Sequence, residues 1–295
     1  MDGEHVLKGP ISLFDFSKYD DIYDAALVSE TSQNGGWRIS DDSVIGGFSR
    51  SQFDVIRTKE DYEKFNMGDA DVNSSFLDMP RQDDITNTAP ASATSPPPLP
   101  PNDDIHRPFV RWHGTLDTRI GENSRADRSG FCAIRSPEFP FGGANLGHKY
   151  NALEFVCRSD GRPYTINLKV TTFFPDDMYQ GLIQQKKEED QEEKGNERLI
   201  IKQEQYQHPS SSQFQKDLGD GFSRVILPFR KFLHTSVGRV REMQRILDGC
   251  VQVETIGLTL MDAKDGDFHF DLARIRVVNY YDGLILGEED EGAPY

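Results

Sequence analysis

The sequence has few cysteines and no long apolar run. Its three cysteines, Cys132, Cys157 and Cys250, are far apart and odd in number. This pattern argues against a disulfide framework and against a CxxC metal or redox site, and we expect buried thiols in a reducing compartment. No apolar stretch approaches the roughly 18 residues that a membrane-spanning helix requires, so we do not expect the chain to cross a bilayer by itself.

Targeting signals and basic surfaces are also missing from the sequence. The chain begins with Met1-Asp2-Gly3-Glu4, whereas a secretory signal is apolar and a mitochondrial presequence is rich in arginine and poor in acids. No presequence is visible in this numbering. The formal net charge of −16 would repel the phosphate backbone, and the lysines and arginines are scattered, so nucleic acid is not an expected partner.

Catalytic and metal-binding signatures are mostly absent. The sequence has no P-loop, no GxGxxG, no GxSxG and no HExxH, and the segment around Ser49 lacks the second glycine of a nucleophile elbow. The histidines are never spaced as a metal pair. Acidic clusters at 41–42, 176–177 and 262–267 are typical of turns, with a structural calcium ion as the alternative. We therefore expect no catalytic residues, no cofactor and no metal, and we expect that the protein is not an enzyme.

Two low-complexity segments interrupt the chain. Residues 57–107 are rich in Pro, Asp, Ser and Thr, and residues 184–214 carry a mixed-charge run. Such segments cannot bury enough apolar surface to offset the entropy of ordering. We expect a single domain from 11 to 280, a disordered insertion at 57–107, a charged insertion at 184–214 and an acidic tail at 281–295. A Pro-rich ligand for an SH3-like partner and a partner-binding role for 184–214 stay open as alternatives.

The rest of the chain shows the patterns of short strands. Apolar residues fall on one face at 153, 155 and 157, and again at 164, 166, 168 and 170, which is typical of half-buried strands. The Asp160-Gly161 pair suits a tight hairpin turn between them, and only 238–248 has helical periodicity. The pattern predicts an all-β fold, an antiparallel β-sandwich or jelly roll, with strands at 109–116, 131–135, 152–158, 164–172, 223–228, 253–261 and 268–278.

The most distinctive segment runs from Trp37 to Ser51. It combines an aromatic anchor, an acidic turn and a Gly-Gly pair that permits positive φ or close backbone approach. Two interpretations remain open, a structural corner of the sandwich and a surface for a ligand or partner. The candidate residues for either role, here and in two later motifs, are Trp37, Asp41, Gly46, Gly47, Ser49, Arg135, Asp160 and Arg162.

This segment resembles the Trp…Ser-Asp…Gly-Gly-x-Ser opening of the complex I intermediate-associated family. Further pieces occur in that family's order: Trp112-His113-Gly114-Thr115-Leu116, Gly130 to Ser136, Tyr150 to Tyr164, Val225 to Phe232, Ile256 to Asp262 and Gly266 to Ile275. Together they cover most of residues 11 to 280 apart from the two insertions. Asp267 stands where the family usually has Pro, and the charged segment replaces an aromatic-rich stretch before Ser223.

The resemblance implies a galactose-binding-like β-sandwich that acts as a chaperone in building mitochondrial complex I, NADH:ubiquinone oxidoreductase, without catalytic residues. Its implied partners are complex I subunits, assembly intermediates and other assembly factors, on the matrix side of the inner membrane, with membrane association only through those partners. A photosystem-biogenesis factor in a plastid is one alternative. A carbohydrate-binding jelly-roll module is another, and it would need Trp37, Trp112 or a tyrosine at a concave surface.

Overall fold

The computed structural model describes residues 9–16, 36–56, 107–121, 129–147, 149–172, 174, 176–184, 214–218, 221–236, 238–248 and 250–287. Most of both predicted insertions and the end of the acidic tail lie outside these residues. In the described part no helix is long and apolar enough to cross a membrane; its helices are 3-10 turns, η1 (Asp42–Ile45), η2 (Pro140–Gly142) and η6 (Phe229–Lys231).

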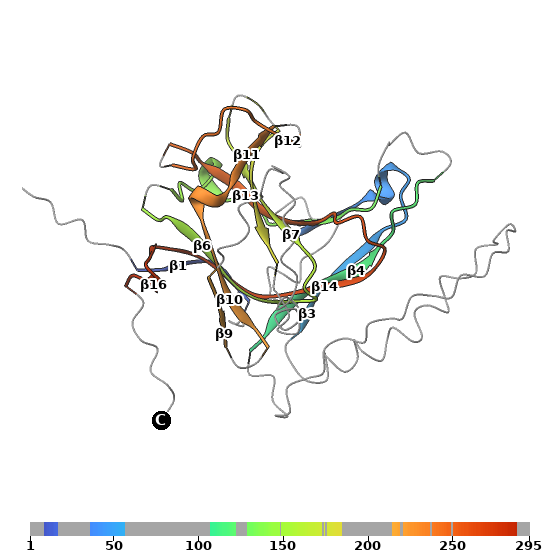
Figure 1. The fold of residues 1–295 in the computed structure, drawn as a ribbon, viewed down its shortest axis with the longest axis horizontal. Helices are drawn as coiled ribbons and strands as arrows, with labels where there is room; N and C mark the ends of the chain where they lie inside the picture. The colour runs from blue at the N-terminus through green and yellow to red at the C-terminus, as the bar shows by residue number, and fades with distance from the viewer. Residues whose placement is uncertain are drawn as a thin grey trace, which may run out of the picture.

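Two antiparallel sheets lie one above the other (Figure 1). The first sheet has the order β3 (Arg50–Ile56), β4 (Phe109–Leu116), β14 (Gly266–Val278), β6 (Ala152–Ser159), β10 (Ser223–Pro228) and β9 (Phe214–Asp217), with β1 (Ile11–Asp15) also paired to β14. The second has the order β12 (Arg239–Val240), β11 (Leu233–Ser236), β8 (Asp177–Ile183), β7 (Tyr164–Val170), β13 (Val253–Leu260), β5 (Cys132–Arg135) and β2 (Arg38–Asp41). A small hairpin of β15 (Tyr280–Tyr281) and β16 (Leu284–Ile285) follows. The predicted fold class, an antiparallel β-sandwich, is confirmed.

The core lies between the inner faces of the two sheets. On β7, Tyr164, Ile166, Leu168 and Val170 are buried and the residues between them are half-buried, which is the alternation expected of a strand with one face inside. β6 differs, because it is buried on both faces. Its outer face carries Glu154 and Arg158, two charged residues that bind partners on neighbouring strands.

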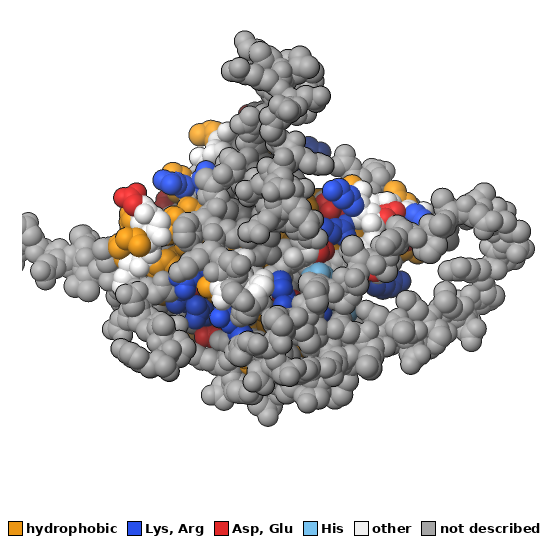
Figure 2. All heavy atoms as spheres, turned by 60° about the horizontal axis from the view of Figure 1, so that its bottom comes forward, with side chains coloured by type: hydrophobic (Ala, Val, Ile, Leu, Met, Phe, Trp, Pro, Cys, Tyr) orange, Lys and Arg blue, Asp and Glu red, His pale blue; other side chains and the backbone are white. Residues whose placement is uncertain are grey.

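The outer face of the first sheet holds two buried ion-pair groups. The Asp271 carboxylate accepts hydrogen bonds from Nε of Arg111 at 2.6 Å and from Nε of Arg158 at 2.8 Å. Burial raises the pKa of Asp271, but these guanidinium groups outweigh burial and hold it below its usual range. The Glu154 carboxylate likewise accepts two hydrogen bonds from Arg276, from Nε at 2.9 Å and from Nη2 at 2.6 Å. Figure 2, which brings the underside of Figure 1 forward, shows blue Lys and Arg side chains gathered on this side of the molecule.

Three sequence-based expectations are wrong in detail. The Asp160-Gly161 turn has positive φ at Gly161, but β6 and β7 belong to different sheets, so the turn is a crossing between layers and not a hairpin. Residues 238–248 form no helix, because Gly238 turns the chain into β12 and Gln244 bonds the backbone of His234. Cys132 and Cys157 are buried as expected, whereas Cys250 is exposed.

Candidate functional site

Trp37 anchors the segment that the sequence singles out. Its side chain is only 2% exposed, and its ring stacks on Phe53 with centroids 5.5 Å apart and meets Phe14 edge-on at 5.2 Å. Since Phe53 belongs to the first sheet and β2, next to Trp37, to the second, the indole ties the two layers together. Trp112 is also buried, against Tyr164 and Phe268.

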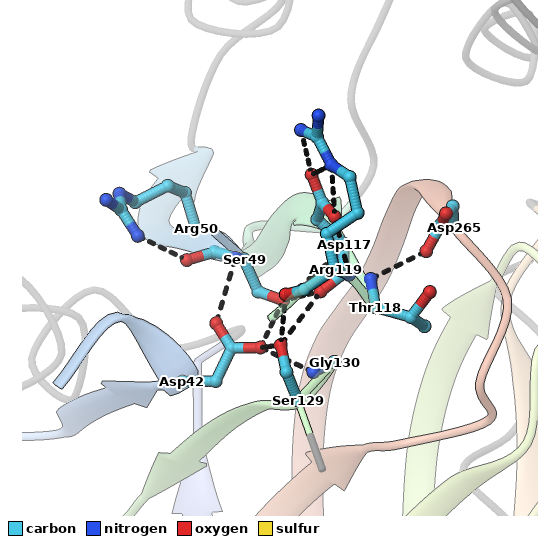
Figure 3. Close-up of polar contacts among 9 residues, drawn as sticks. All are labelled: Asp42, Ser49, Arg50, Asp117, Thr118, Arg119, Ser129, Gly130 and Asp265. Atoms are coloured by element: carbon cyan, nitrogen blue, oxygen red, sulfur yellow. Dashed lines mark hydrogen bonds and ion pairs between the residues drawn. The ribbon is translucent and has the colours of Figure 1, made fainter. Parts of the chain in front are cut away.

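Asp42 is the centre of a buried hydrogen-bond network just after β2 (Figure 3). Its carboxylate accepts the N–H and the hydroxyl of Ser49, both at 2.9 Å, the hydroxyl of Ser129 at 2.9 Å and the N–H of Gly130 at 2.5 Å. Burial raises the pKa of Asp42, but the bonds from Gly130, Ser129 and Ser49 together hold it below its usual range. The ionised carboxylate thus joins three separate segments of the chain.

The glycine pair makes room for this carboxylate. Gly46 ends η1 with φ of 90°, a conformation that favours glycine. A Cβ on Gly47 would lie 2.3 Å from Cγ of Asp42, which is far inside van der Waals contact. Gly46 also accepts a hydrogen bond from the N–H of Gly121 at 3.2 Å, and Gly47 bridges to Ile120.

Ser49 is fully buried and serves the same network. Its hydroxyl donates to Asp42 and lies 3.2 Å from the carbonyl oxygen of Asp117. The backbone N–H of Asp117 donates to the same hydroxyl at 3.1 Å. A nucleophile must reach a substrate and a base. Ser49 has a carboxylate beside it, but its side chain is fully buried. The hydroxyl is therefore not accessible to a substrate, and this geometry offers no reason to assign it catalysis.

Asp41 points the other way and fixes the start of β3. It accepts the N–H of Ser51 at 2.9 Å and the hydroxyl of the same residue at 2.6 Å. Burial raises the pKa of Asp41, and the bonds from Ser51 oppose that rise without cancelling it. Burial also raises the pKa of the Cys132 thiol well above its usual range, with the Asp41 charge adding to the effect, so this cysteine stays protonated and unreactive.

Arg162 and Asp160 build a second corner, after β6. The Arg162 guanidinium reaches Asp262 at 2.6 and 2.9 Å and the carbonyl groups of Gly266 and Asp267 at 3.2 and 3.3 Å. Asp160 accepts the Tyr164 hydroxyl at 3.0 Å. A guanidinium therefore fills the acidic loop at 262–267, which the sequence left open to a calcium ion.

The two corners lie at the same end of the sandwich. The loop after β4 connects them, because Asp117 contacts Ser49 while the N–H of Thr118 donates to Asp265 at 2.7 Å (Figure 3). Arg135 stays apart from both. It lies at the end of β5, next to the edge strand β2, and pairs along its backbone with Arg38 and Gly257, so the eight candidate residues do not converge on one point.

The chemistry of this end is that of an internally bonded scaffold. Across the described ranges no three His, Cys, Asp or Glu side chains gather as a metal site would require; the absence of a metal and of a cofactor stays a prediction for the whole chain. Asp42 is absent from the candidate residues expected from the sequence, although it lies in the acidic turn singled out there. Ser129 and Asp117 are further parts of the network that sequence reasoning missed. Nothing in the sequence marks them, since Ser129 lies 87 residues from Asp42.

Comparison with known proteins identifies relatives of this chain. Residues 101–195 match the model of the family described as Complex I intermediate-associated protein 30 (CIA30). A curated relative from the mouse, Mus musculus, "Complex I intermediate-associated protein 30, mitochondrial", is 29% identical over 172 residues, which are 56% of this chain and 43% of the relative. The chain thus spans less than half the length of this curated relative.

Two solved structures with some likeness to this chain are carbohydrate-binding modules. A family 11 module from Clostridium thermocellum in complex with a β-1,3-1,4-mixed-linked tetrasaccharide gives a TM-score of 0.38 at 13% identity, covering 92% of this chain and 96% of that one. A family 11 module of the cellulase Lic26A-Cel5E from the same organism gives 0.39 at 12% identity, covering 91% and 94%. These scores carry no argument about function. The resemblance expected from the ordered motifs is confirmed by the family model over residues 101–195.

Proposed function

We propose that this protein is a non-enzymatic assembly factor that binds intermediates of mitochondrial complex I, NADH:ubiquinone oxidoreductase. The observation that carries the proposal is the match of residues 101–195 to the CIA30 family, together with the name of the mouse relative. Its partners would be complex I subunits and other assembly factors, and it would act on the matrix side of the inner membrane.

The geometry of the candidate site supports binding over chemistry. Asp42, Ser49 and Arg162 are used up in hydrogen bonds that hold the end of the sandwich in place. An enzyme site would bring titratable groups together in a pocket with access for a substrate. In the part of the chain that the structure describes, these groups instead bond one another and the backbone.

The carbohydrate-binding alternative gains nothing from the tryptophans. A sugar platform needs an aromatic ring lying flat at an exposed concave surface, and both Trp37 and Trp112 are buried. We therefore retain the assembly role as the best-supported function.

Affinity purification tests the proposed function. The tagged protein, expressed at native level in its own organism, should recover complex I subunits in a subcomplex smaller than the mature enzyme on native gels, together with other assembly factors. An unrelated tagged β-sandwich sent to the same compartment is the control. Recovery of photosystem subunits would move the protein to the plastid alternative, and recovery of neither set would contradict an assembly role.

A further inference from the structure

Large apolar side chains are exposed at the end of the molecule where η1 lies. Four of them belong to the two turns that the Asp42 network joins. They are Val44 at 77%, Ile45 at 40%, Phe48 at 47% and Ile120 at 45% exposure. We call these four residues the apolar tip. Exposed apolar groups that cluster, unlike scattered ones, mark interaction surfaces.

The apolar tip is held rigidly from behind. The N–H of Gly121 donates to the carbonyl of Gly46, and Gly47 forms a β-bridge with Ile120. The Asp42 carboxylate accepts the N–H groups of Ser49 and Gly130. Side chains on a fixed backbone lose little entropy when a partner covers them. The corner therefore has a second consequence besides stability, since it presents the tip in one conformation.

Two arginines flank the tip. Arg119 lies over the Phe48 ring, with its guanidinium carbon 5.2 Å from the centroid, and it binds Asp117 through Nε and Nη2. Arg50, two residues beyond Phe48, donates to the Ser49 carbonyl through Nη1 (Figure 3). Both are exposed on a chain with a net charge of −16. Aromatic and arginine side chains are both enriched at the energetic centre of protein interfaces.

We propose that the apolar tip is the anchor of a protein–protein interface. It inserts into an apolar groove of a partner protein whose rim carries carboxylates that meet Arg50 and Arg119. The identity of the partner, a complex I subunit or assembly factor, rests on the proposed function, whereas the surface itself rests on the exposure, rigidity and charge of these residues.

Charge selects this occupant over two others. An anionic membrane surface repels a chain of net charge −16, and two arginines offset little of that charge. A second copy packed tip to tip would bring Arg50 and Arg119 of both copies together, and like charges disfavour such a contact. A concave groove can enclose the tip from several sides and extend the contact around it.

Polar substitution of the tip tests the inference in cells. The variant Val44→Ser/Phe48→Ser/Ile120→Ser should keep the melting temperature of the wild type, because exposed substitutions change stability little. We expect it to lower recovery of complex I subunits by about tenfold or more, as the loss of an interface centre does. The matched control is Val240→Ser/Met243→Ser/Ile246→Ser, which removes three exposed apolar side chains at and beyond the opposite edge of the second sheet and should bind normally.

Photo-cross-linking separates this inference from the proposed function. A photoreactive phenylalanine analogue at position 48 should form an adduct with a complex I subunit or assembly factor, and the same analogue at position 243 should not. An adduct with lipid alone, or full complementation of a knockout by the tip variant, would overturn the interface. A knockout with normal complex I would instead overturn the proposed function.

Discussion

At the scale of residues, one carboxylate determines the conformation of the most distinctive motif. Asp42 gathers donors from the β3 side of the motif and from the segment at 129–130, and Gly47 is needed because any side chain there would collide with that carboxylate. The motif's Ser-Asp-Asp and Gly-Gly elements are therefore two halves of one packing arrangement. The same arrangement carries the apolar tip.

Substitution of Gly47 tests this packing. Gly47→Ala should lower the free energy of unfolding by about 1–3 kcal/mol, the usual cost of overpacking, because the new Cβ meets three atoms of the Asp42 carboxyl. The same substitution in an Asp42→Ala background should cost less than about 0.5 kcal/mol, since the obstructing atoms are gone. Urea unfolding of the four proteins completes the cycle. Equal costs in both backgrounds would contradict the account.

The lowered pKa of Asp42 predicts how its contribution depends on pH. A carboxyl whose pKa in the folded state lies below its usual range stabilises the protein above about pH 4, and this stabilisation is lost as pH falls through the folded-state pKa. The difference in unfolding free energy between wild type and Asp42→Ala should therefore shrink between pH 5 and pH 2. Chemical denaturation at several pH values measures it, and a constant difference would show that Asp42 is not stabilised in its ionised form.

The sequence predicts part of this site and not the rest. Trp37 and the Gly46-Gly47 pair can be recognised in the sequence because a tryptophan and two adjacent glycines are distinctive beside an acidic turn. Ser129 and the Asp117 backbone are not visible, because a serine hydroxyl and a carbonyl are common and their role depends on a contact between distant segments. The Arg162–Asp262 pair is 100 residues apart and equally hidden.

At the scale of elements, seven of the strands are predicted, including the four-residue β5, whereas strands without a clear apolar pattern, among them the seven-residue β3 and β8, are missed. β7 and β13 are recognised from their apolar positions, and each pairs with two neighbours in the second sheet. β2 and β11 have four residues each, and most of these are polar. In β8 the buried positions include Asp177 and Gly181, so its alternation does not show as an apolar period. Local sequence patterns also do not predict which strands pair, because pairing depends on which sheet each strand joins after its turn.

Removal of the Pro-rich segment tests the predicted insertion. Ile56 and Phe109 are cross-strand partners at the adjoining ends of β3 and β4, so a short turn can connect them. Replacing residues 60–105 with a short Gly/Ser linker should leave the melting temperature within a few degrees of the wild type. Differential scanning calorimetry measures it. A large drop would show that this segment contributes to the folded structure.

At the scale of the whole molecule, the protein is a β-sandwich with a well-bonded end that presents apolar side chains. The fold class could be predicted from the succession of short strands without crossover helices. The order of strands in the two sheets could not, because antiparallel sandwiches of many topologies share the same local patterns. The proposed function rests on the family match at residues 101–195, since the fold alone supports many activities.

The amount and activity of complex I in cells that lack this protein test the central claim most directly. Native gels with in-gel NADH dehydrogenase staining should show less mature complex I and accumulated membrane-arm intermediates, while the turnover per remaining complex stays normal, because an assembly factor leaves the finished enzyme unchanged. Complementation with the wild type should restore the amount. A normal amount of mature complex I in the knockout would contradict the account, whether or not the turnover per complex is reduced.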